Sequence, residues 1–327
     1  MTQTTTSPTP SSLGQVERHI FLRAVLSGVD VGAAAGALVS MIRDAYFPAG
    51  TVIYREGESS DHLYFVVDGV VSLNRPGQEP WIMDPRSVFG ALDASLDRPH
   101  DRTAVAVDDV HVMLLAVEDW LDILEDHFEL ARAVIQRNAS GLHELCLKLT
   151  PTGGFVEPMA SLEAEDQEPP PSSAVPDQLD VVDRLLVLSE APLFKRAGIQ
   201  PLLMLAPAAE ARHLAPGEVL FEQGDRVALL HVVARGIIEI EREDPPIRAR
   251  FGRGELVAGA PAIANAERAF TARAATDAMV VTLRREDLVD VMEDHFAALR
   301  SVLAYLAEER DRMQRLEAEL KAGASQQ

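Results

Sequence analysis

The pattern of apolar and polar residues along this chain runs through helices, then short strands, then helices, and then repeats. Short runs rich in β-branched and aromatic residues, separated by Gly, Pro and Asp, predict strands. They read TVIYR, LYFVV, VVSLN, PWIM, TAVAV and VHVMLL in the first half, and EVLFE, LLHVV, IIEIE, IRARF, FTARAA and MVVTL in the second. Helical periodicity covers 16–28, 34–47 and 118–136 around the first set. The pattern predicts an α+β fold of two tandem antiparallel β-barrel or jelly-roll domains, each flanked by helices.

The repeat is visible in the residues themselves. AVEDWLDILEDHF at 116–128 recurs as RREDLVDVMEDHF at 284–296, and 48–73 matches 215–240. Three glycine pairs fall in register, namely Gly50 with Gly217, Gly57 with Gly224 and Gly69 with Gly236. Glycines fixed between apolar runs indicate turns that need a positive φ or a close approach of two backbones. Two copies of this length indicate a duplicated domain rather than a solenoid.

A change in composition separates the two copies. The segment 151–178 holds six prolines and six acidic residues but neither Lys nor Arg, so we expect a solvated, rather extended linker. This gives a first domain at 14–150 and a second at 179–320. Tails are expected at 1–13 and 321–327.

Charge and composition narrow the partners and the compartment. The formal net charge of −21 repels nucleic-acid backbones and anionic membranes, and the basic residues are scattered, so neither is expected as a partner. The chain lacks an apolar run long enough for a membrane span, and MTQTTTSPTPSS does not read as a secretory signal. The single cysteine, Cys146, lies among apolar residues and is expected to be a buried helical thiol. We expect a cytoplasmic protein.

Each copy resembles the cyclic-nucleotide-binding domain of catabolite-activator-type regulators and protein kinase A regulatory subunits. PAGTVIYREGE…LYFVVDGVVSL, SVFGALDASLDRPHDRTAVAV and the LEDHF helix carry the resemblance in the first copy. APGEVLFEQGD…LHVVARGIIEI, GELVAGAPAIANAERAFTARA and MEDHF carry it in the second. It covers nearly the whole chain outside the tail and linker, and it is more specific for the fold than for a ligand.

The resemblance implies a phosphate site in the first copy. In the family, a short helix directs its N-terminal amides and dipole at the cyclic phosphate, an arginine pairs with the phosphate oxygens, and a neighbouring Ser or Thr adds a hydrogen bond. Gly90, Arg102 and Thr103 match these positions, and cyclic AMP or cyclic GMP is the implied ligand, with no cofactor expected. The family's glutamate, which binds the ribose hydroxyl, is replaced by Ala91. Without the repeat and the family match, Arg102 reads as a loop residue paired with a carboxylate; with them, the two readings stand level.

The second copy departs further from the family. Its Gly-Glu pair reads Ala258-Gly259, and we match Arg268 to the phosphate arginine, with Ala269 in the place of the hydroxyl and a loop two residues shorter. Arg268 is therefore predicted at most as a weak second anion site.

The last helix carries a heptad pattern. Leu299, Leu306, Met313 and Leu320 recur every seven residues, Val302 and Leu316 fill the intervening positions, and Glu309 interrupts them. This seam predicts homodimerisation through the C-terminal helix. The alternative is that the helix folds back on its own domain.

An acidic-histidine triplet occurs in both copies. Glu125-Asp126-His127 recurs as 293–295, but neighbouring residues on a helix point in different directions, so a helix junction is favoured over a metal site.

Two functions remain open. The sequence shows no catalytic motif, no DNA-reading helix-turn-helix after the second copy and no pseudosubstrate. One hypothesis is therefore a non-enzymatic sensor that binds a cyclic nucleotide or similar small anion and signals to an unidentified protein partner. The other is an adaptor or scaffold whose domains have lost their ligand.

Overall fold

The computed structural model describes residues 13–26, 32, 34–149, 178–226, 229–243 and 247–324. The predicted tail 1–13 and linker 151–178 lie almost entirely outside these residues. The chain divides into two compact units, Met1–Leu130 and Ala131–Gln327. The division falls before the predicted linker, so residues 131–149, predicted as part of the first domain, belong with the second unit.

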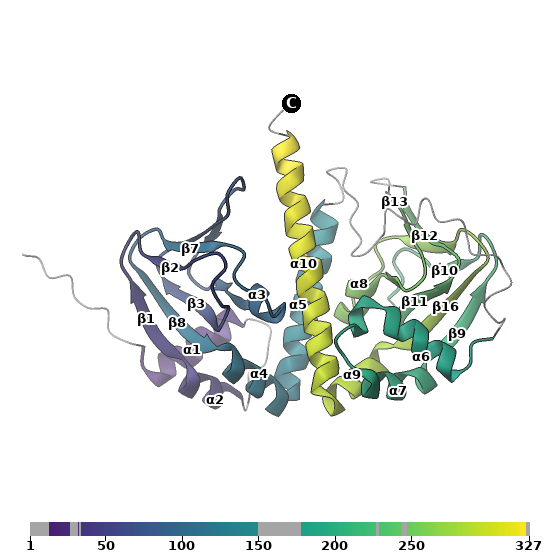
Figure 1. Cartoon of the computed structure of the whole chain (residues 1–327), viewed down its shortest axis with the longest axis horizontal. Coiled ribbons are helices and arrows are strands. Elements are labelled where there is room, and N and C mark those ends of the chain that lie inside the picture. The colour runs from purple at the N-terminus through teal and green to yellow at the C-terminus, as the bar shows by residue number, and fades with distance from the viewer. Residues whose placement is uncertain are drawn as a thin grey trace, which may run out of the picture. The chain divides into compact units, whose positions relative to one another are not determined.

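The first unit is a jelly roll of two four-stranded antiparallel sheets (Figure 1). Its elements are α1 (Gln15–Val25), α2 (Ala34–Met41), β1 (Arg43–Phe47), β2 (Val52–Tyr54), β3 (His62–Asp68), β4 (Val71–Asn74), β5 (Trp81–Met83), β6 (Val88–Phe89), α3 (Ala91–Ser95), β7 (Thr103–Ala106), β8 (Val110–Ala116) and α4 (Val117–Asp126). The sheet orders are β1-β8-β3-β6 and β2-β7-β4-β5. The predicted α+β fold is confirmed.

The second unit repeats this plan strand for strand. It contains α5 (Phe128–Leu149, from Ala131 onward), α6 (Val181–Glu190), the 3₁₀ turn η3 (Pro192–Phe194), α7 (Ile199–Ala208), β9 (Glu210–Leu214), β10 (Val219–Phe221), β11 (Leu229–Arg235), β12 (Ile238–Arg242), β13 (Ile247–Phe251), β14 (Leu256–Val257), α8 (Gly259–Ala264), β15 (Thr271–Ala274), β16 (Ala278–Arg284), α9 (Arg285–Asp294) and α10 (Phe296–Ala324). Its sheet orders, β9-β16-β11-β14 and β10-β15-β12-β13, match those of the first unit.

One predicted element is wrong at its end. The helical pattern at 34–47 breaks at Ile42, and Arg43–Phe47 form strand β1, which pairs with β8 in antiparallel register from Arg43–Leu114 to Phe47–Val110. The alternating residues of DAYF suit a pleated strand, and a contribution to the sheet edge outweighs the local helical period.

The core of each jelly roll lies between its two sheets. In the first unit the buried cluster is Tyr54, Val66, Val71, Leu73, Phe89, Ala104, Ala106, Val110 and Val112. Turn glycines allow the strands to close around it. Gly69 has a φ of 82°, and a Cβ there would lie 2.5 Å from the Asp109 carbonyl oxygen; at Gly236, with a φ of 76°, a Cβ would lie 2.2 Å from the Asp277 carbonyl oxygen. The sequence prediction for these repeated glycines is confirmed.

Two long helices of the second unit, α5 and α10, lie side by side (Figure 1). Lys148 on α5 forms a 3.1 Å ion pair with Glu317 on α10, and a Cβ at Gly141 would lie 3.5 Å from Arg310 Nη1. Both contacts join a residue to one 169 positions later, so the helices run parallel. Since the repeat offset is 167–168, α5 and α10 meet at nearly equivalent points of the two copies.

Within the described residues, no helix is long and apolar enough to cross a membrane. Cys146 is a buried thiol on α5, as the sequence predicts.

Candidate phosphate-binding site

A glycine starts the short helix that the sequence predicts to face a phosphate. Gly90 is the N-cap of α3 and has a φ of 82°. A Cβ at this position would lie 2.6 Å from the His62 carbonyl oxygen, so both the backbone angle and the space require glycine. The predicted position of Gly90 at the head of this helix is confirmed by the geometry.

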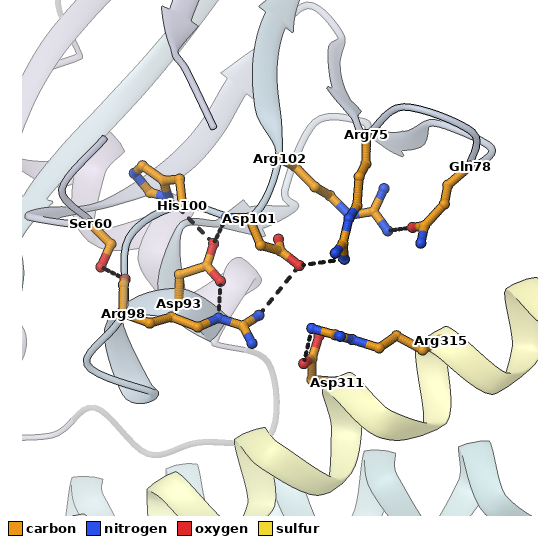
Figure 2. Close-up of polar contacts among 10 residues, drawn as sticks. All are labelled: Ser60, Arg75, Gln78, Asp93, Arg98, His100, Asp101, Arg102, Asp311 and Arg315. Carbon is orange, nitrogen blue, oxygen red and sulfur yellow. Dashed lines mark hydrogen bonds and ion pairs between the residues drawn. The ribbon is translucent and has the colours of Figure 1, made fainter. Parts of the chain in front are cut away.

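Arg102 lies directly before β7 with its side chain almost fully buried (4% exposed). Its Nη2 donates a 2.7 Å hydrogen bond to Gln78 Oε1, as Figure 2 shows, and its Cζ lies 3.6 Å from the centroid of the Trp81 ring. Neither the Gln78 amide nor the Trp81 indole carries a formal charge. Neither Gln78 nor Trp81 could be identified from the sequence, because the folding of the β4–β5 hairpin brings them to Arg102.

Thr103 has a structural contact of its own. Its Oγ1 accepts a 3.1 Å hydrogen bond from the backbone N–H of Glu56, and Thr271 Oγ1 accepts one of the same length from Gln223 N–H in the second unit. A hydroxyl retained in both copies for this turn is not by itself a sign of ligand binding. Its O–H remains a donor that can be directed at an anion.

Two carboxylates lie in the same region, beside α3 and before β7. Asp93 is buried, accepts a 2.8 Å hydrogen bond from Arg98 Nε and lies 3.4 Å from His100 Nδ1. Burial alone would raise the pKa of Asp93, but the hydrogen bonds from His100 and Arg98 outweigh it and hold this pKa below its ordinary value. Asp93 is therefore an anion committed to its own loop and does not replace the missing glutamate.

Asp101 is the second carboxylate. It pairs with Arg75 at 3.3 Å and with Arg98 at 3.4 Å (Figure 2). Arg75, from the β4–β5 hairpin, and Arg98, from the loop before β7, thus both contact Asp101 (Figure 2).

The register of the second unit corrects the match made for Arg268. Gly57 N–H donates to the His100 carbonyl at 2.8 Å, and the equivalent Gly224 N–H donates to the Arg268 carbonyl at 2.9 Å. Arg268 therefore corresponds to His100. The position of Arg102 is taken by Phe270, and that of Thr103 by Thr271.

The sequence match to Arg102 was wrong because it followed residue type, whereas the strand pairs β2–β7 and β10–β15 fix the register. The loops that lead from Gly90 to His100 and from Ala258 to Arg268 have equal lengths. The predicted shortening by two residues and the predicted place of Ala269 are wrong for the same reason.

Arg268 is directed into its own domain. It is 1% exposed, its Nη1 donates to the Ala258 carbonyl at 2.8 Å, its Nη2 donates to the Leu229 carbonyl at 2.6 Å, and its Cζ lies 4.6 Å from the centre of the Phe221 ring. It holds the start of α8 against β11. The geometry gives no support to the weak second anion site predicted at Arg268.

The helix α8 of the second unit is also covered. All six of its residues are buried, and a Cβ at Gly259 would lie 2.3 Å from Leu256 Cδ2 and 2.9 Å from the Tyr305 hydroxyl of α10. The position that corresponds to Gly90 is Ala258, which has a φ of 55°. With Phe270 in place of the arginine, this half has lost the features that would hold a phosphate.

The heptad seam of α10 is largely buried within the single chain. Leu299, Val302, Leu306 and Met313 are at most 2% exposed, and Leu316 and Leu320 are half-buried. The buried residues of α5 (Ala131, Ile135, Ala139, Leu142, Cys146 and Leu149) are also spaced by three and four. Four of the six predicted contacts are thus covered without a second copy.

The Glu-Asp-His repeats lie at helix junctions. His127 is the C-cap of α4 and His295 that of α9, and each donates its N–H back into the preceding helix. The predicted helix-to-helix turn is confirmed. Over the described part of the chain, no three His, Cys, Asp or Glu side chains group as metal ligands would.

Comparison with known families agrees with this geometry. The profile of the family described as "Cyclic nucleotide-binding domain" matches residues 45–127 and 211–295, just over half of the chain. The chain belongs to the cyclic nucleotide-binding domain family. It carries two such domains in tandem, each on a jelly roll, as the resemblance implies.

Individual relatives match this chain over shorter stretches. A "CRP-like cAMP-activated global transcriptional regulator" of Mycobacterium tuberculosis is 30% identical over 129 residues, which are 36% of this chain and 57% of the relative. A "cyclic nucleotide-gated potassium channel" of Mesorhizobium japonicum is 32% identical over 94 residues, 29% of this chain and 26% of the channel. The chain thus spans little more than half the length of the transcriptional regulator and about a quarter of the length of the channel.

Among solved structures, the regulatory domain of Toxoplasma gondii PKA with cAMP is 15% identical to this chain. The match covers 90% of this chain and 97% of that one, with a TM-score of 0.34.

Proposed function

We propose that this protein is a non-enzymatic cytoplasmic sensor. Its first domain binds a cyclic nucleotide or a similar small anion at Gly90, Arg102 and Thr103, and it signals through contacts with a protein partner. Family membership and the regulatory names of its relatives support a regulatory role. The ligand and the signalling route are our proposal.

The observation that carries this proposal is the contrast between Arg102 and Arg268. The contacts of Arg102 include the Gln78 side-chain amide and the Trp81 ring, and a phosphate can offer the same guanidinium charge-assisted, bidentate bonds. The backbone carbonyls of Ala258 and Leu229 accept hydrogen bonds from Arg268, and turning this side chain towards a ligand would leave both carbonyls without this donor. Only the first copy retains an arginine that a ligand can recruit.

Binding is expected to be weaker than the family pattern allows. Ala91 removes the acceptor for the ribose hydroxyl, and a hydrogen bond to a charged group contributes about 1.5–3 kcal/mol, or roughly 10- to 150-fold in affinity. The search for ligands must therefore extend to millimolar concentrations.

Calorimetric titration tests the proposal. The full chain is titrated with cyclic AMP, cyclic GMP and cyclic di-GMP, beside Arg102→Ala and a matched control, Arg43→Ala, whose arginine is exposed on β1. One-site binding that persists in Arg43→Ala and disappears in a folded Arg102→Ala supports the sensor. The absence of both heat and a shift in melting temperature with every ligand at millimolar concentration overturns it.

A ligand-free adaptor is the second candidate. Phe270, the inward Arg268 and the covered α8 support this candidate, because the second copy keeps the fold with these groups in place of the family's phosphate contacts. If the first copy fails the titration as well, both domains are assembly modules.

A further inference from the structure

An apolar stripe runs along the outside of α7. Ile199, Leu203 and Met204 are 51%, 49% and 55% exposed, and Pro207 and Ala208 are exposed as well. Their spacing places them on one side of the helix. The helix, IQPLLMLAPA, has no charged residue, although the chain has a net charge of −21.

The neighbouring helix α6 extends this surface. It packs against α7 within the second unit (Figure 1) and exposes Val181, Val182 and Leu186. We call the exposed side chains of Val181, Val182, Leu186, Ile199, Leu203, Met204 and Pro207 the α6–α7 face. Large apolar side chains exposed on two packed helices are typical of interaction sites.

The α6–α7 face is particular to the second copy. In the first unit α1 exposes Val16 and Ile20, the counterparts of Val182 and Leu186. On α2, however, Gly36, Ala37 and Ser40 stand where α7 has Leu203, Met204 and Pro207. The fold of the helix pair therefore does not require large apolar residues there, and their presence in one copy needs another reason.

Charges at the two ends of α7 identify the occupant. Lys195 is exposed eight residues before Leu203, ahead of the helix, and Glu210 is exposed seven residues after it, beyond the end of the helix. Arg284 lies close to Glu210 but is hydrogen-bonded to Asp287 through two nitrogens, at 3.0 and 2.7 Å. If two such helices pack antiparallel across Leu203, each Lys195 meets the other copy's Glu210.

We propose that two copies of this chain dimerise through the α6–α7 face, around a twofold axis at Leu203. A twofold interface brings the same surface of both copies together, so it must be self-complementary. The uncharged stripe with a cation at one end and an anion at the other meets this condition. It also lets two strongly acidic molecules touch where neither carries charge.

This dimer differs from the one that the heptad seam predicts. Most of the α10 seam is already buried within the chain, whereas the α6–α7 face is exposed. An interface formed by two helices from each copy is small for a specific interface. We therefore expect the dimer to have a dissociation constant in the micromolar range.

Sedimentation velocity of the full chain over a range of concentrations tests the proposal. We expect wild type to form dimers, and Leu203→Glu to raise the dissociation constant more than tenfold because it buries two like charges at the axis. Ile20→Glu, at the counterpart of Leu186 in the first copy, is the matched control and should leave the dimer unchanged. Circular dichroism confirms that each variant is folded.

A charge exchange makes the test specific to the twofold arrangement. Lys195→Glu and Glu210→Lys should each weaken the dimer several-fold, and the double variant should restore it. A wild-type chain that stays monomeric throughout the range overturns the proposal, as does a dimer that survives Leu203→Glu. Ligand titration is independent of this result, so failure of the sensor proposal remains distinguishable.

Discussion

At the residue scale, position 91 determines how firmly the first domain can hold a ribose. Ala91 opens α3 directly after Gly90, and nothing at this position can accept a bond from a ribose hydroxyl. We expect Ala91→Glu to tighten the binding of a cyclic nucleotide by roughly 10- to 150-fold. Calorimetry beside Ala94→Glu, which adds the same charge on the same helix, checks this. Equal affinities in Ala91→Glu and wild type would contradict it.

His231 gives a second prediction at this scale. Burial, followed by the charges of Arg268 and Arg212, lowers the pKa of His231 to about 3, and its Nδ1 lies 3.0 Å from Thr282 Oγ1. The folded state therefore keeps this imidazole neutral, whereas the unfolded chain protonates it near pH 6.5. The free energy of unfolding is unaffected above that pH and falls as the pH drops from about 6.5 towards 3.

The expected loss from His231 alone is about 2 kcal/mol at pH 5. Urea unfolding at pH 7 and pH 5 measures it, with His231→Leu losing this part of the pH dependence and the exposed His62→Leu retaining it. An unchanged pH dependence in His231→Leu would show that another group is responsible.

The residues of the candidate site show what can be predicted from the sequence at this scale. Gly90, Arg102 and Thr103 were found because their types and spacing fit a family pattern. Arg268 was misplaced because an arginine near the correct distance resembled the expected one, whereas the backbone bond from Gly224 shows that it replaces His100. Side-chain type indicates chemistry, but only strand register assigns a position.

At the element scale, the pairing of α5 with α10 decides what the heptad pattern means. The sequence predicted a seam on α10 and favoured a second copy as its partner over a fold-back, because a heptad shows that a face must be covered and does not show by which helix. Likewise, the strand β1 was hidden at the end of a helical pattern. Local periodicity predicts most elements here, and the exceptions lie where a tertiary partner determines the outcome.

We expect Met313→Ala to lower the free energy of unfolding by about 2–5 kcal/mol, since this side chain is fully buried and its removal leaves a cavity. Lys148→Ala is the control: it removes an exposed ion pair with Glu317 and should cost less than about 1 kcal/mol. Urea denaturation compares the two. A cost below 1 kcal/mol for Met313→Ala would mean that the α10 face is not packed as described.

At the scale of the whole molecule, two units of one fold carry different chemistry. The tandem fold was predictable because the same six strand patterns occur in both copies in the same order. The burial of α8 in the second copy was not predictable from the sequence. It depends on the inward direction of Arg268 and on Tyr305, which contacts α8 from a helix far along the chain.

A ligand should therefore stabilise only one unit. At a concentration of about 100 times its dissociation constant, a cyclic nucleotide is expected to add about 2.7 kcal/mol to the unit that binds it. Differential scanning calorimetry should show one transition raised and one unchanged, with no shift in Arg102→Ala. A uniform shift of the whole profile would place binding in both copies or outside the predicted site.

The parallel contact of α5 with α10 at nearly equivalent residues has a consequence for the history of the chain. In an assembly of identical subunits, every substitution enters both partners at once, so a lost binding site is lost twice. Here the two helices belong to one polypeptide, and a change such as Phe270 or Ala258 affects a single copy. Duplication within the chain leaves each half free to specialise: the first keeps Arg102, the arginine of the proposed anion site, and the second uses Arg268 to close its own fold.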